Sequence, residues 1–294
     1  MSELTREQVL LDYVKGDRDF RLLDLSGIQL SGVNLSKADF TGADLTGADL
    51  SGAHLRGAVF NAAVLRGANL CYADLTGASL NAADLNQAQL AEATLNEASL
   101  AIADLIEANL NRARLREADL QGANLTRATL RGATLFRANL VEAIFIEADL
   151  SRTYLRVARL AYVNFNMANL REATLHDANL SQGDLVMADF TKARLFSANL
   201  HEANLRFANL GEADLTGADL TGANLTGADL ANADLTQAML DRANLTRANV
   251  AGANFAEATL HGARLAQVDT SAMLNADLGD ITTEAMKLET SIIL

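Results

Sequence analysis

The hydrophobic and polar positions of this chain repeat with a period of five residues. Over residues 20–265 every fifth residue is Leu, Phe or Val, and over residues 38–263 an alanine stands two positions before each of them. The alanine register has three exceptions, which are Thr153, Val163 and Gly183. A helix repeats its faces about every 3.6 residues and a strand every two, so neither explains this period. The pattern therefore predicts a repeat architecture.

Blocks such as Ala-Asp-Leu-Thr-Gly at residues 43–47 and 218–222 carry a family resemblance. They resemble the A-[DN]-L-x-x unit of the pentapeptide-repeat family, and the resemblance covers roughly residues 20–269. It implies an all-β fold, a right-handed quadrilateral β-helix (a β-solenoid) with four pentads in each coil. The Leu or Phe and the Ala of each pentad are expected to point inward and the other three residues outward. The leader residues Tyr13, Gly16, Arg18 and Phe20 resemble those of many cyanobacterial members, and in character the chain is most like the regulatory ones.

A coil of four pentads makes its own predictions about spacing. Large inward rings should align at multiples of twenty residues, as Phe20, Phe40 and Phe60 do, and as Phe145 and Phe165 do. A narrow core has little spare volume, so a ring packs best beside another ring. Fifteen of the 19 glycines stand two residues after an inward Leu, Phe or Val. We place them at corners, where a turn can need the positive φ that glycine tolerates best.

Composition limits the cellular setting and the chemistry. The 294-residue chain is acidic, with a net charge of −13, and has one cysteine, Cys71, and no proline. The lack of proline suits a fold in which nearly every amide donates a hydrogen bond, and a lone cysteine excludes an intrachain disulfide and a thiolate metal cage. Residues 1–20 hold no signal-peptide run, and no apolar stretch of about 18 residues is present. We therefore expect a cytoplasmic protein without a membrane span.

Both ends of a β-helix expose apolar side chains and unpaired backbone, so both need covers. Residues 5–15 are predicted to form a helical lid, because Thr5 to Gln8 indicates a capping box and Gly16 a helix stop. The apolar face of this helix is expected to consist of Val9, Leu10, Tyr13 and Val14.

At the other end the five-residue period fails at Thr270. Asp280 is a candidate N-cap for a helix over roughly residues 281–290, with Ile281, Ala285, Leu288 and Ile292 inward. This segment is either a lid or, as the resemblance to gyrase-protecting relatives implies, a dimer contact, so we expect a monomer or a dimer formed through the C-terminus. We divide the chain into an N-terminal helical cap (1–16), a pentapeptide-repeat β-helix (17–269) and a helical C-terminal cap (270–294).

The sequence offers no constellation for catalysis or metal binding. His201 and His261 share a predicted column but lie three coils apart, too far for one metal ion. Ser181 and His201 fall in adjacent coils, which chance explains better than a serine–base pair does. There is no phosphate loop, HExxH or paired-cysteine motif, and a shaft filled with Leu and Ala has no inner pocket. We predict no enzyme, no cofactor and no metal site.

The polar residues before each inward Leu are interpreted as structural. One predicted column alternates aspartate with asparagine, in the order Asp149, Asn169, Asp189, Asn209, Asp229 and Asn249. Alternation keeps like charges from facing each other across adjacent coils and retains amide hydrogen bonds.

Two predicted sides of the solenoid depart from the usual polar surface. On the first, outward positions that are polar elsewhere are apolar, and we predict a protein-binding surface there. The candidate residues of this apolar side are Val141, Ile144, Ile146, Tyr162, Met167, Val186, Met187 and Phe207, with Ile102 and Ile106 nearer the N-terminus. The alternative is drift of the repeat, in which the apolar side chains cover one another.

The opposite side gathers basic residues against the acidic composition. The candidate residues of this Arg/aromatic side are Arg112, Arg114, Arg116, Arg131, Phe136, Arg152, Tyr154, Arg156, Arg171, Lys192, Arg194 and Phe196, and Arg137 lies in the same band. One corner column alternates cations and rings, in the order Arg116, Phe136, Arg156, His176 and Phe196, which predicts cation–π contacts. These contacts either stabilise the corner or anchor an interface. Interspersed acidic residues disfavour nucleic acid and suit an acidic protein partner.

Three functional hypotheses follow. The leading one is a non-catalytic interaction scaffold or regulator, whose unidentified protein partner docks on the mid-chain surface between about residues 100 and 207. The resemblance offers a second, a DNA mimic that modulates a topoisomerase such as DNA gyrase. The net charge fits it, but the Asp/Asn column is far sparser than B-DNA, which carries one negative charge per ~1.7 Å. The third is a rigid structural spacer without a specific site.

Overall fold

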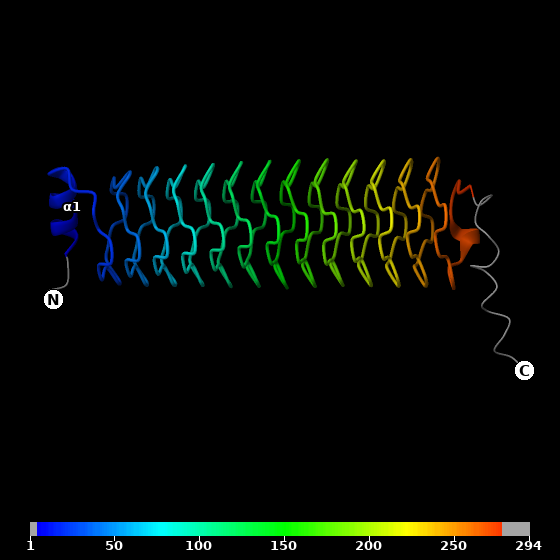
Figure 1. Cartoon of the computed structure of the whole chain (residues 1–294), viewed down its shortest axis with the longest axis horizontal. Helices are drawn as coiled ribbons and strands as arrows, with labels where there is room; N and C mark the ends of the chain where they lie inside the picture. Colours follow the sequence, from blue (N-terminus) through cyan, green and yellow to red (C-terminus); the bar gives the residue numbers. More distant parts are fainter. Residues whose placement is uncertain (1–4, 278–294) are drawn as a thin grey trace, which may run out of the picture. The chain divides into compact units, whose positions relative to one another are not determined.

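The computed structural model describes residues 5–277 of the chain. The chain divides into two compact units, Met1–Tyr154 and Leu155–Leu294, and each is described by itself. The named elements among the described residues are α1, an α-helix at Arg6–Val14, and η1, a 3₁₀ helix at Thr270–Ala272 (Figure 1). Between them, the described backbone pairs through isolated parallel β-bridges, without a longer strand.

The backbone of each unit coils with a repeat of twenty residues. Parallel bridges join Asp39 to Val59 in the first unit and Asp189 to Asn209 in the second, and the other bridges of both units have the same spacing. Figure 1 shows the resulting succession of coils within each unit. The coil of four pentads predicted from the sequence is therefore confirmed, while the right hand of the coil remains a prediction.

Every amide of a typical pentad has a partner, as residues 44–48 illustrate. Asp44, Leu45 and Gly47 donate to carbonyls of adjacent coils at 2.9, 2.7 and 2.9 Å, and Ala48 donates to the Leu45 carbonyl at 3.0 Å. The remaining amide, of Thr46, donates to the Asp44 carboxylate at 2.9 Å. A proline in such a pentad would leave an acceptor without its donor, which explains why the chain has none. The Asp or Asn before each Leu supplies the acceptor that the backbone lacks.

Leu, Phe and Ala side chains of the pentads fill the interior of each unit, as predicted, and most of them are fully buried. The rings of Phe20, Phe40 and Phe60 stack on one another with centroid distances of 5.3 and 4.9 Å. Phe145 in the first unit and Phe165 in the second are also fully buried. The twenty-residue spacing therefore predicted correctly that these rings lie in the interior of the two units.

Two exceptions in the alanine register compensate each other. A Cβ atom added at Gly183 would lie 3.3 Å from Val163 Cγ1 and 3.1 Å from the Leu180 carbonyl oxygen. Val163 is fully buried one coil earlier, so its extra methyl group uses the space that glycine leaves free. The third exception, Thr153, is also buried, and its hydroxyl donates to the Leu150 carbonyl at 2.7 Å.

The corner residue two positions after each inward Leu adopts a positive φ. The fifteen predicted corner glycines have φ values from 61° to 71°, which confirms the turn prediction. Residues with side chains adopt the same conformation at other corners, for example Tyr162 at 60° and Phe207 at 57°. This left-handed region costs a residue other than glycine roughly 1 kcal/mol or more. The fold requires the left-handed conformation at every corner. Its cost in free energy arises only where the corner residue is not glycine.

Helix α1 packs at the start of the first unit, in the position predicted for a lid. The Thr5 hydroxyl accepts a hydrogen bond from the Gln8 amide at 3.3 Å, and Val9 is fully buried. The Tyr13 hydroxyl donates to the Ser36 carbonyl at 3.0 Å. The prediction that Val14 belongs to the apolar face is wrong, because its side chain is 82% exposed. Five residues separate it from Val9, which at 3.6 residues per turn carries it well around the helix.

The last described coil keeps the twenty-residue spacing after the sequence pattern has stopped. Leu274 pairs with Asn254, and Met273 is buried in place of an alanine. The helix predicted over residues 281–290 lies outside the described residues, and the domain boundaries remain a prediction. Within residues 5–277, no helix has the length and apolar character needed to cross a membrane.

Candidate protein-binding surfaces

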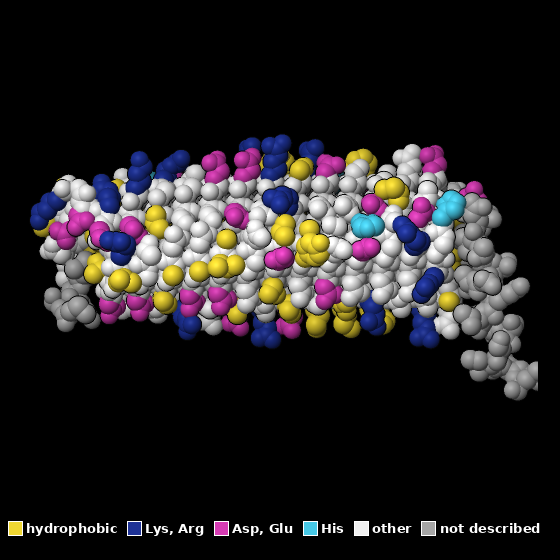
Figure 2. Space-filling view, in the orientation of Figure 1, with side chains coloured by type: hydrophobic (Ala, Val, Ile, Leu, Met, Phe, Trp, Pro, Cys, Tyr) yellow, Lys and Arg dark blue, Asp and Glu magenta, His cyan; other side chains and the backbone are white. Residues whose placement is uncertain are grey.

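Three exposed apolar side chains form a line on the second unit. Met167, Met187 and Phe207 occupy the same corner of three successive coils, and their side chains are 54%, 57% and 52% exposed. We call these three residues the apolar stripe. Figure 2 shows hydrophobic side chains, in yellow, interrupting the polar surface on the face in view. All three belong to the apolar side that the sequence predicts.

The backbone conformation of the apolar stripe disfavours large side chains, so a gain in folding stability does not explain their presence. Its three residues have φ values of 59°, 59° and 57°, whereas the same corner of the next coil is held by Gly227. Each residue of the stripe therefore adopts a conformation that side chains disfavour, and leaves about half of an apolar side chain in water. Neither property favours folding of the chain alone.

The second unit carries further apolar and cationic side chains at another corner and next to the apolar stripe in the sequence. Tyr162 is exposed at another corner of the second unit. Val186 is half-buried, and its amide donates to the Asn166 side-chain oxygen at 2.9 Å. The Arg206 guanidinium lies 5.5 Å from the centroid of the Phe207 ring, within the range of a cation–π contact. The stripe thus has the aromatic, methionine and arginine composition that is typical of interface cores.

The apolar candidates of the first unit are less accessible. Val141, Ile144 and Ile146 are half-buried, and Ile144 pairs with Asn124 in a β-bridge. Ile102 is exposed at a left-handed corner, above Gly122 of the next coil. Half-burial is usual at the pentad positions of Val141, Ile144 and Ile146, and Val186 of the second unit is half-buried in the same way.

Basic residues of the Arg/aromatic side meet in the first unit. We call Arg112, Arg114, Arg116, Arg131, Phe136 and Arg137 the basic face. All of its arginines are exposed, and Phe136 is half-buried. The Arg116 and Arg137 guanidinium groups lie 5.4 and 5.1 Å from the Phe136 centroid. The cation–π contact predicted for Arg116 is present, and Arg137 adds a second one that the column argument missed, because this arginine is the sequence neighbour of Phe136.

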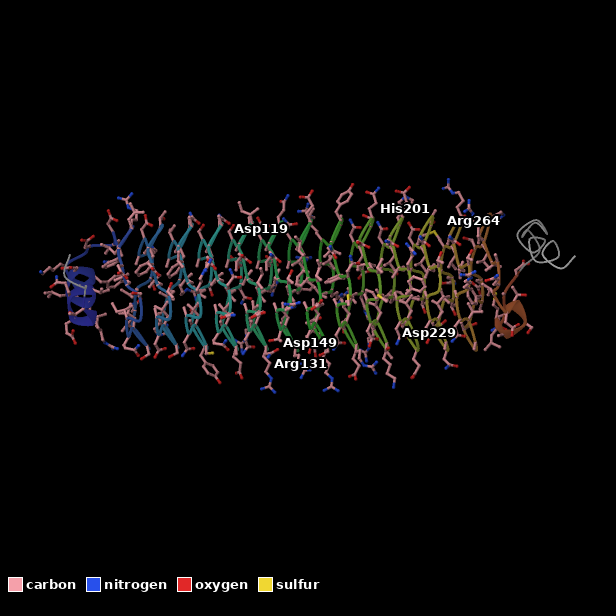
Figure 3. All side chains as sticks on the ribbon, turned by 90° about the horizontal axis from the view of Figure 1, so that it is seen from below. Asp119, Arg131, Asp149, His201, Asp229 and Arg264 are labelled. Atoms are coloured by element: carbon pink, nitrogen blue, oxygen red, sulfur yellow. The ribbon has the colours of Figure 1, made fainter. Side chains whose placement is uncertain are left out.

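Carboxylates neutralise part of the basic face. Arg112 pairs with Glu92 at 3.6 Å and Arg131 with Asp149 at 2.5 Å, the latter pair seen in Figure 3. Glu117 lies 3.4 Å from Arg116 and 4.0 Å from Arg137, so it serves both. Within residues 5–277, the side chain of Arg114 makes no ion pair or hydrogen bond, and its β-bridge partners are Thr94 and Thr134.

The candidates of the Arg/aromatic side in the second unit are mostly ion-paired. Arg156 approaches Asp177 at 3.8 Å, Arg171 contacts Asp189 at 3.1 Å, and Lys192 contacts Glu212 at 3.4 Å. The predicted His176–Phe196 contact is present as an edge-to-face pair with a centroid distance of 6.0 Å. Arg194 is exposed between its bridge partners Thr174 and Asp214. The remaining candidates, Arg152 and Tyr154, are exposed at the end of the first unit.

Three exposed apolar residues of the second unit were missed by sequence reasoning, namely Val157, Met239 and Leu274. Val157 stands at a left-handed corner with φ 59°, like the residues of the apolar stripe. Its signal was available, because a β-branched residue stands where the repeat often has glycine.

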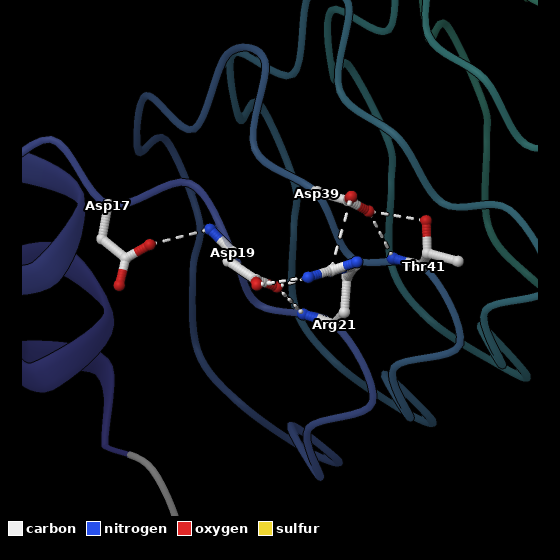
Figure 4. Close-up of polar contacts among 5 residues, drawn as sticks. All are labelled: Asp17, Asp19, Arg21, Asp39 and Thr41. Atoms are coloured by element: carbon white, nitrogen blue, oxygen red, sulfur yellow. Dashed lines mark hydrogen bonds and ion pairs between the residues drawn. The ribbon is translucent and has the colours of Figure 1, made fainter.

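A shallow depression near the N-terminus holds the most perturbed carboxylate of the described chain. It is lined by Asp19, Arg21, Leu22 and Thr41. Figure 4 shows the polar contacts of Asp19, Arg21 and Thr41. Arg21 donates two hydrogen bonds to the Asp19 carboxylate at 2.8 and 2.6 Å, which lower the pKa of Asp19 to about 2. Arg21 also lies 3.8 Å from Asp39, the bridge partner of Asp19. This arginine separates two aspartates that would otherwise repel each other, which is a structural role.

His54, His201 and His261 lie singly on the surface, and His176 is half-buried against Phe196. His201 is 3.7 Å from Glu202 and His261 is 3.7 Å from Asp241, and no hydrogen bond joins the side chains of Ser181 and His201 among residues 5–277. In the same part of the chain, no group of three or more His, Cys, Asp or Glu side chains is arranged to hold a metal ion.

These features define a repeat solenoid, in which a packed interior carries surfaces that differ from coil to coil. A family model for pentapeptide repeats matches the chain in eight copies over residues 24–269. The chain belongs to the pentapeptide repeat family. A comparison with curated protein sequences finds no match.

Solved structures of pentapeptide repeat proteins are similar to the chain. HetL of the cyanobacterium Nostoc sp. strain PCC 7120, described as involved in heterocyst differentiation regulation, is 35% identical over 89% of this chain and 97% of its own, with a TM-score of 0.36. Rfr23 of the cyanobacterium Cyanothece 51142 is 40% identical over 36% of this chain and 63% of its own, with a TM-score of 0.23. QnrB1, a plasmid-mediated fluoroquinolone resistance protein, is 17% identical over 86% and 93%, with a TM-score of 0.26.

Proposed function

We propose that this protein is a non-catalytic regulator or scaffold that binds a protein partner through the apolar stripe. The observation that carries the proposal is that Met167, Met187 and Phe207 are exposed in line at left-handed corners. A sequence selected for folding alone would place glycine or a polar residue at such corners, as most other coils do. An exposed row of methionine and aromatic side chains gives a partner the contacts that dominate binding energy.

The comparison with HetL supports a regulatory role. HetL shares 35% of its residues with this chain over nearly its whole length and is described as involved in regulating heterocyst differentiation. A protein built from packed Leu and Ala coils regulates by contact, because its functional groups lie on its surface.

The charge distribution makes DNA mimicry a weaker candidate. A DNA mimic needs a dense row of negative charge, since B-DNA carries one per ~1.7 Å of axis. In this chain Arg131 pairs with Asp149 and Arg171 with Asp189, so two of the three aspartates of the alternating column are neutralised by cations. A supercoiling assay with DNA gyrase tests this candidate directly, and inhibition or protection at micromolar protein would favour it over the scaffold.

Glycine substitutions test the apolar stripe without disturbing the fold. The triple variant Met167→Gly, Met187→Gly and Phe207→Gly removes the apolar side chains and installs the residue that best tolerates a positive φ. Tyr72→Gly is the matched control, because Tyr72 is 65% exposed at a corner with φ 61° in the first unit. Partners captured from cells of origin are compared by quantitative mass spectrometry. A partner bound by the control and lost from the triple variant supports the proposal, and an identical partner set for both variants refutes it.

A further inference from the structure

We infer that the basic face of the first unit binds an acidic protein segment, through two carboxylates that reach Arg114 and the Arg116–Arg137 pair. The inference concerns a second surface, made of residues other than those of the apolar stripe. It extends the proposed function by naming the chemistry of a partner. It rests on the proposed function in one respect, which is that both surfaces bind protein.

The charges of the basic face do not balance. Its five arginines meet three carboxylates, because Glu92 and Asp149 each serve one arginine while Glu117 serves both Arg116 and Arg137. The surplus is localised. One unneutralised cation is Arg114, which makes no ion pair within residues 5–277, and the other lies in the Arg116–Arg137 pair.

The Arg116–Arg137 pair is held ready for a ligand. Its two guanidinium groups contact the same Phe136 ring, at 5.4 and 5.1 Å from the centroid, and share the Glu117 carboxylate. A ring contact and a shared carboxylate restrict the arginine side chains before binding, so less conformational entropy is lost when a ligand arrives.

The chemistry of the face favours a peptide over nucleic acid. The planar guanidinium group matches the geometry of a carboxylate and of a phosphate equally well. However, Glu92, Glu117 and Asp149 remain within the face, and a continuous row of phosphates would pass beside them. A peptide with two acidic side chains can place its charges at the two cationic positions and avoid these carboxylates. The half-buried Phe136 offers an apolar floor that a peptide can also contact.

Fluorescence anisotropy with defined probes tests the inference. The probes are a labelled flexible peptide with two glutamates, the same peptide with two glutamines, and a labelled single-stranded oligonucleotide. The full-length protein should bind the glutamate peptide at low salt, bind it more weakly at physiological ionic strength, and bind the glutamine peptide at least about tenfold more weakly. No binding of the glutamate peptide at low salt, or tighter binding of the oligonucleotide, overturns the inference.

Two charge reversals locate the site. Arg114→Glu should weaken binding of the glutamate peptide by about tenfold, since it reverses the cation that has no partner of its own. Its threonine neighbours make a misfolding effect unexpected, and an unchanged melting temperature checks this. Arg242→Glu is the control, because it alters an exposed corner arginine of the second unit by the same charge. Equal weakening by both reversals would refute the site. The triple glycine variant of the apolar stripe should bind the peptide normally, so the two proposals fail separately.

Discussion

The ring of Phe207 lies over Gly227, the residue at the same corner one coil further on. A Cβ atom added at Gly227 would lie 2.7 Å from Phe207 Cδ1, closer than two such atoms can approach. Leu22 and Gly42 have the same relationship in the first unit, with Leu22 Cδ2 also at 2.7 Å. A large corner side chain therefore leans toward the following coil, and glycine there leaves room for it.

Substitution of Gly227 by alanine should destabilise the protein in two ways. Alanine at φ 68° costs roughly 1 kcal/mol of strain, and the contact with Phe207 should add about 0.5–1 kcal/mol, because the half-exposed ring must rotate away. Gly47→Ala is the control for strain alone, because nothing lies within 4 Å of its added Cβ atom. Chemical unfolding of both variants separates the cost of backbone strain from the cost of the contact with Phe207. Adding Phe207→Gly to Gly227→Ala should restore the free energy of unfolding that the contact with Phe207 removes. Equal destabilisation by Gly47→Ala and Gly227→Ala would contradict the packing account.

Val163 and Gly183 should behave as a coupled pair. Gly183→Ala places a methyl group 3.3 Å from Val163 Cγ1 and should cost about 1–3 kcal/mol through overpacking. Val163→Ala alone should cost about 1–2 kcal/mol, because it leaves a cavity beside glycine. The double variant restores the usual alanine register and should be more stable than the sum of the two losses predicts. A double-mutant cycle with no coupling energy would show that the two residues pack independently.

The alternation of aspartate with asparagine should contribute measurably to stability. The side-chain amide of Asn249 donates a hydrogen bond to the Asp229 carboxylate of the preceding coil at 2.8 Å. Asn249→Asp replaces this bond with two facing carboxylates and should lower the free energy of unfolding by about 0.2–1 kcal/mol beyond the loss in Asn249→Ala. That extra loss should shrink as the salt concentration rises, because screening weakens the repulsion between the two carboxylates. A difference between the two variants that does not change with salt concentration would contradict the electrostatic explanation.

The hydrogen bonds from Arg21 to Asp19 should be visible in acid. The folded pKa of Asp19, about 2, lies below the ordinary value of about 3.9 for aspartate. The stabilisation from this pair is therefore complete above about pH 4 and is lost as pH falls through about 2. In Arg21→Met, the pKa of Asp19 should rise toward its ordinary value, and NMR titration of the carboxyl carbon measures it directly. An unchanged pKa in this variant would show that Arg21 is not its cause.

The period of the hydrophobic residues predicted a repeat architecture, and the family resemblance implied the coil of four pentads with Leu, Phe and Ala inside. The twenty-residue spacing of the phenylalanines and the register of the glycines agreed with that coil. Local compensation was harder to foresee. Val163 and Gly183 look like separate defects in the sequence, and only the coil geometry places one against the other. Val14 was misplaced because a short helix allows more than one apolar face.

The residues of the candidate surfaces were predicted from the sequence. Which of them are exposed and which form ion pairs was not predicted. Exposure follows the position in the pentad: Val141, the first residue after an inward Leu, is half-buried, whereas Met187, the second residue after one, is exposed. The sequence could not distinguish Arg114 from Arg131, because the ion pair of Arg131 with Asp149 depends on side-chain conformation. The carboxylate shared by Arg116 and Arg137 is a further contact of this kind.

The most direct test of the central proposal is the affinity of one purified partner for two variants of the full chain. The partner is the protein retained most strongly by the unaltered chain, and its dissociation constant is measured by calorimetry against the triple glycine variant of the apolar stripe and against Tyr72→Gly. We predict at least about a tenfold loss of affinity for the triple variant and no change for the control. Equal affinity for both would mean that Met167, Met187 and Phe207 are not the binding surface.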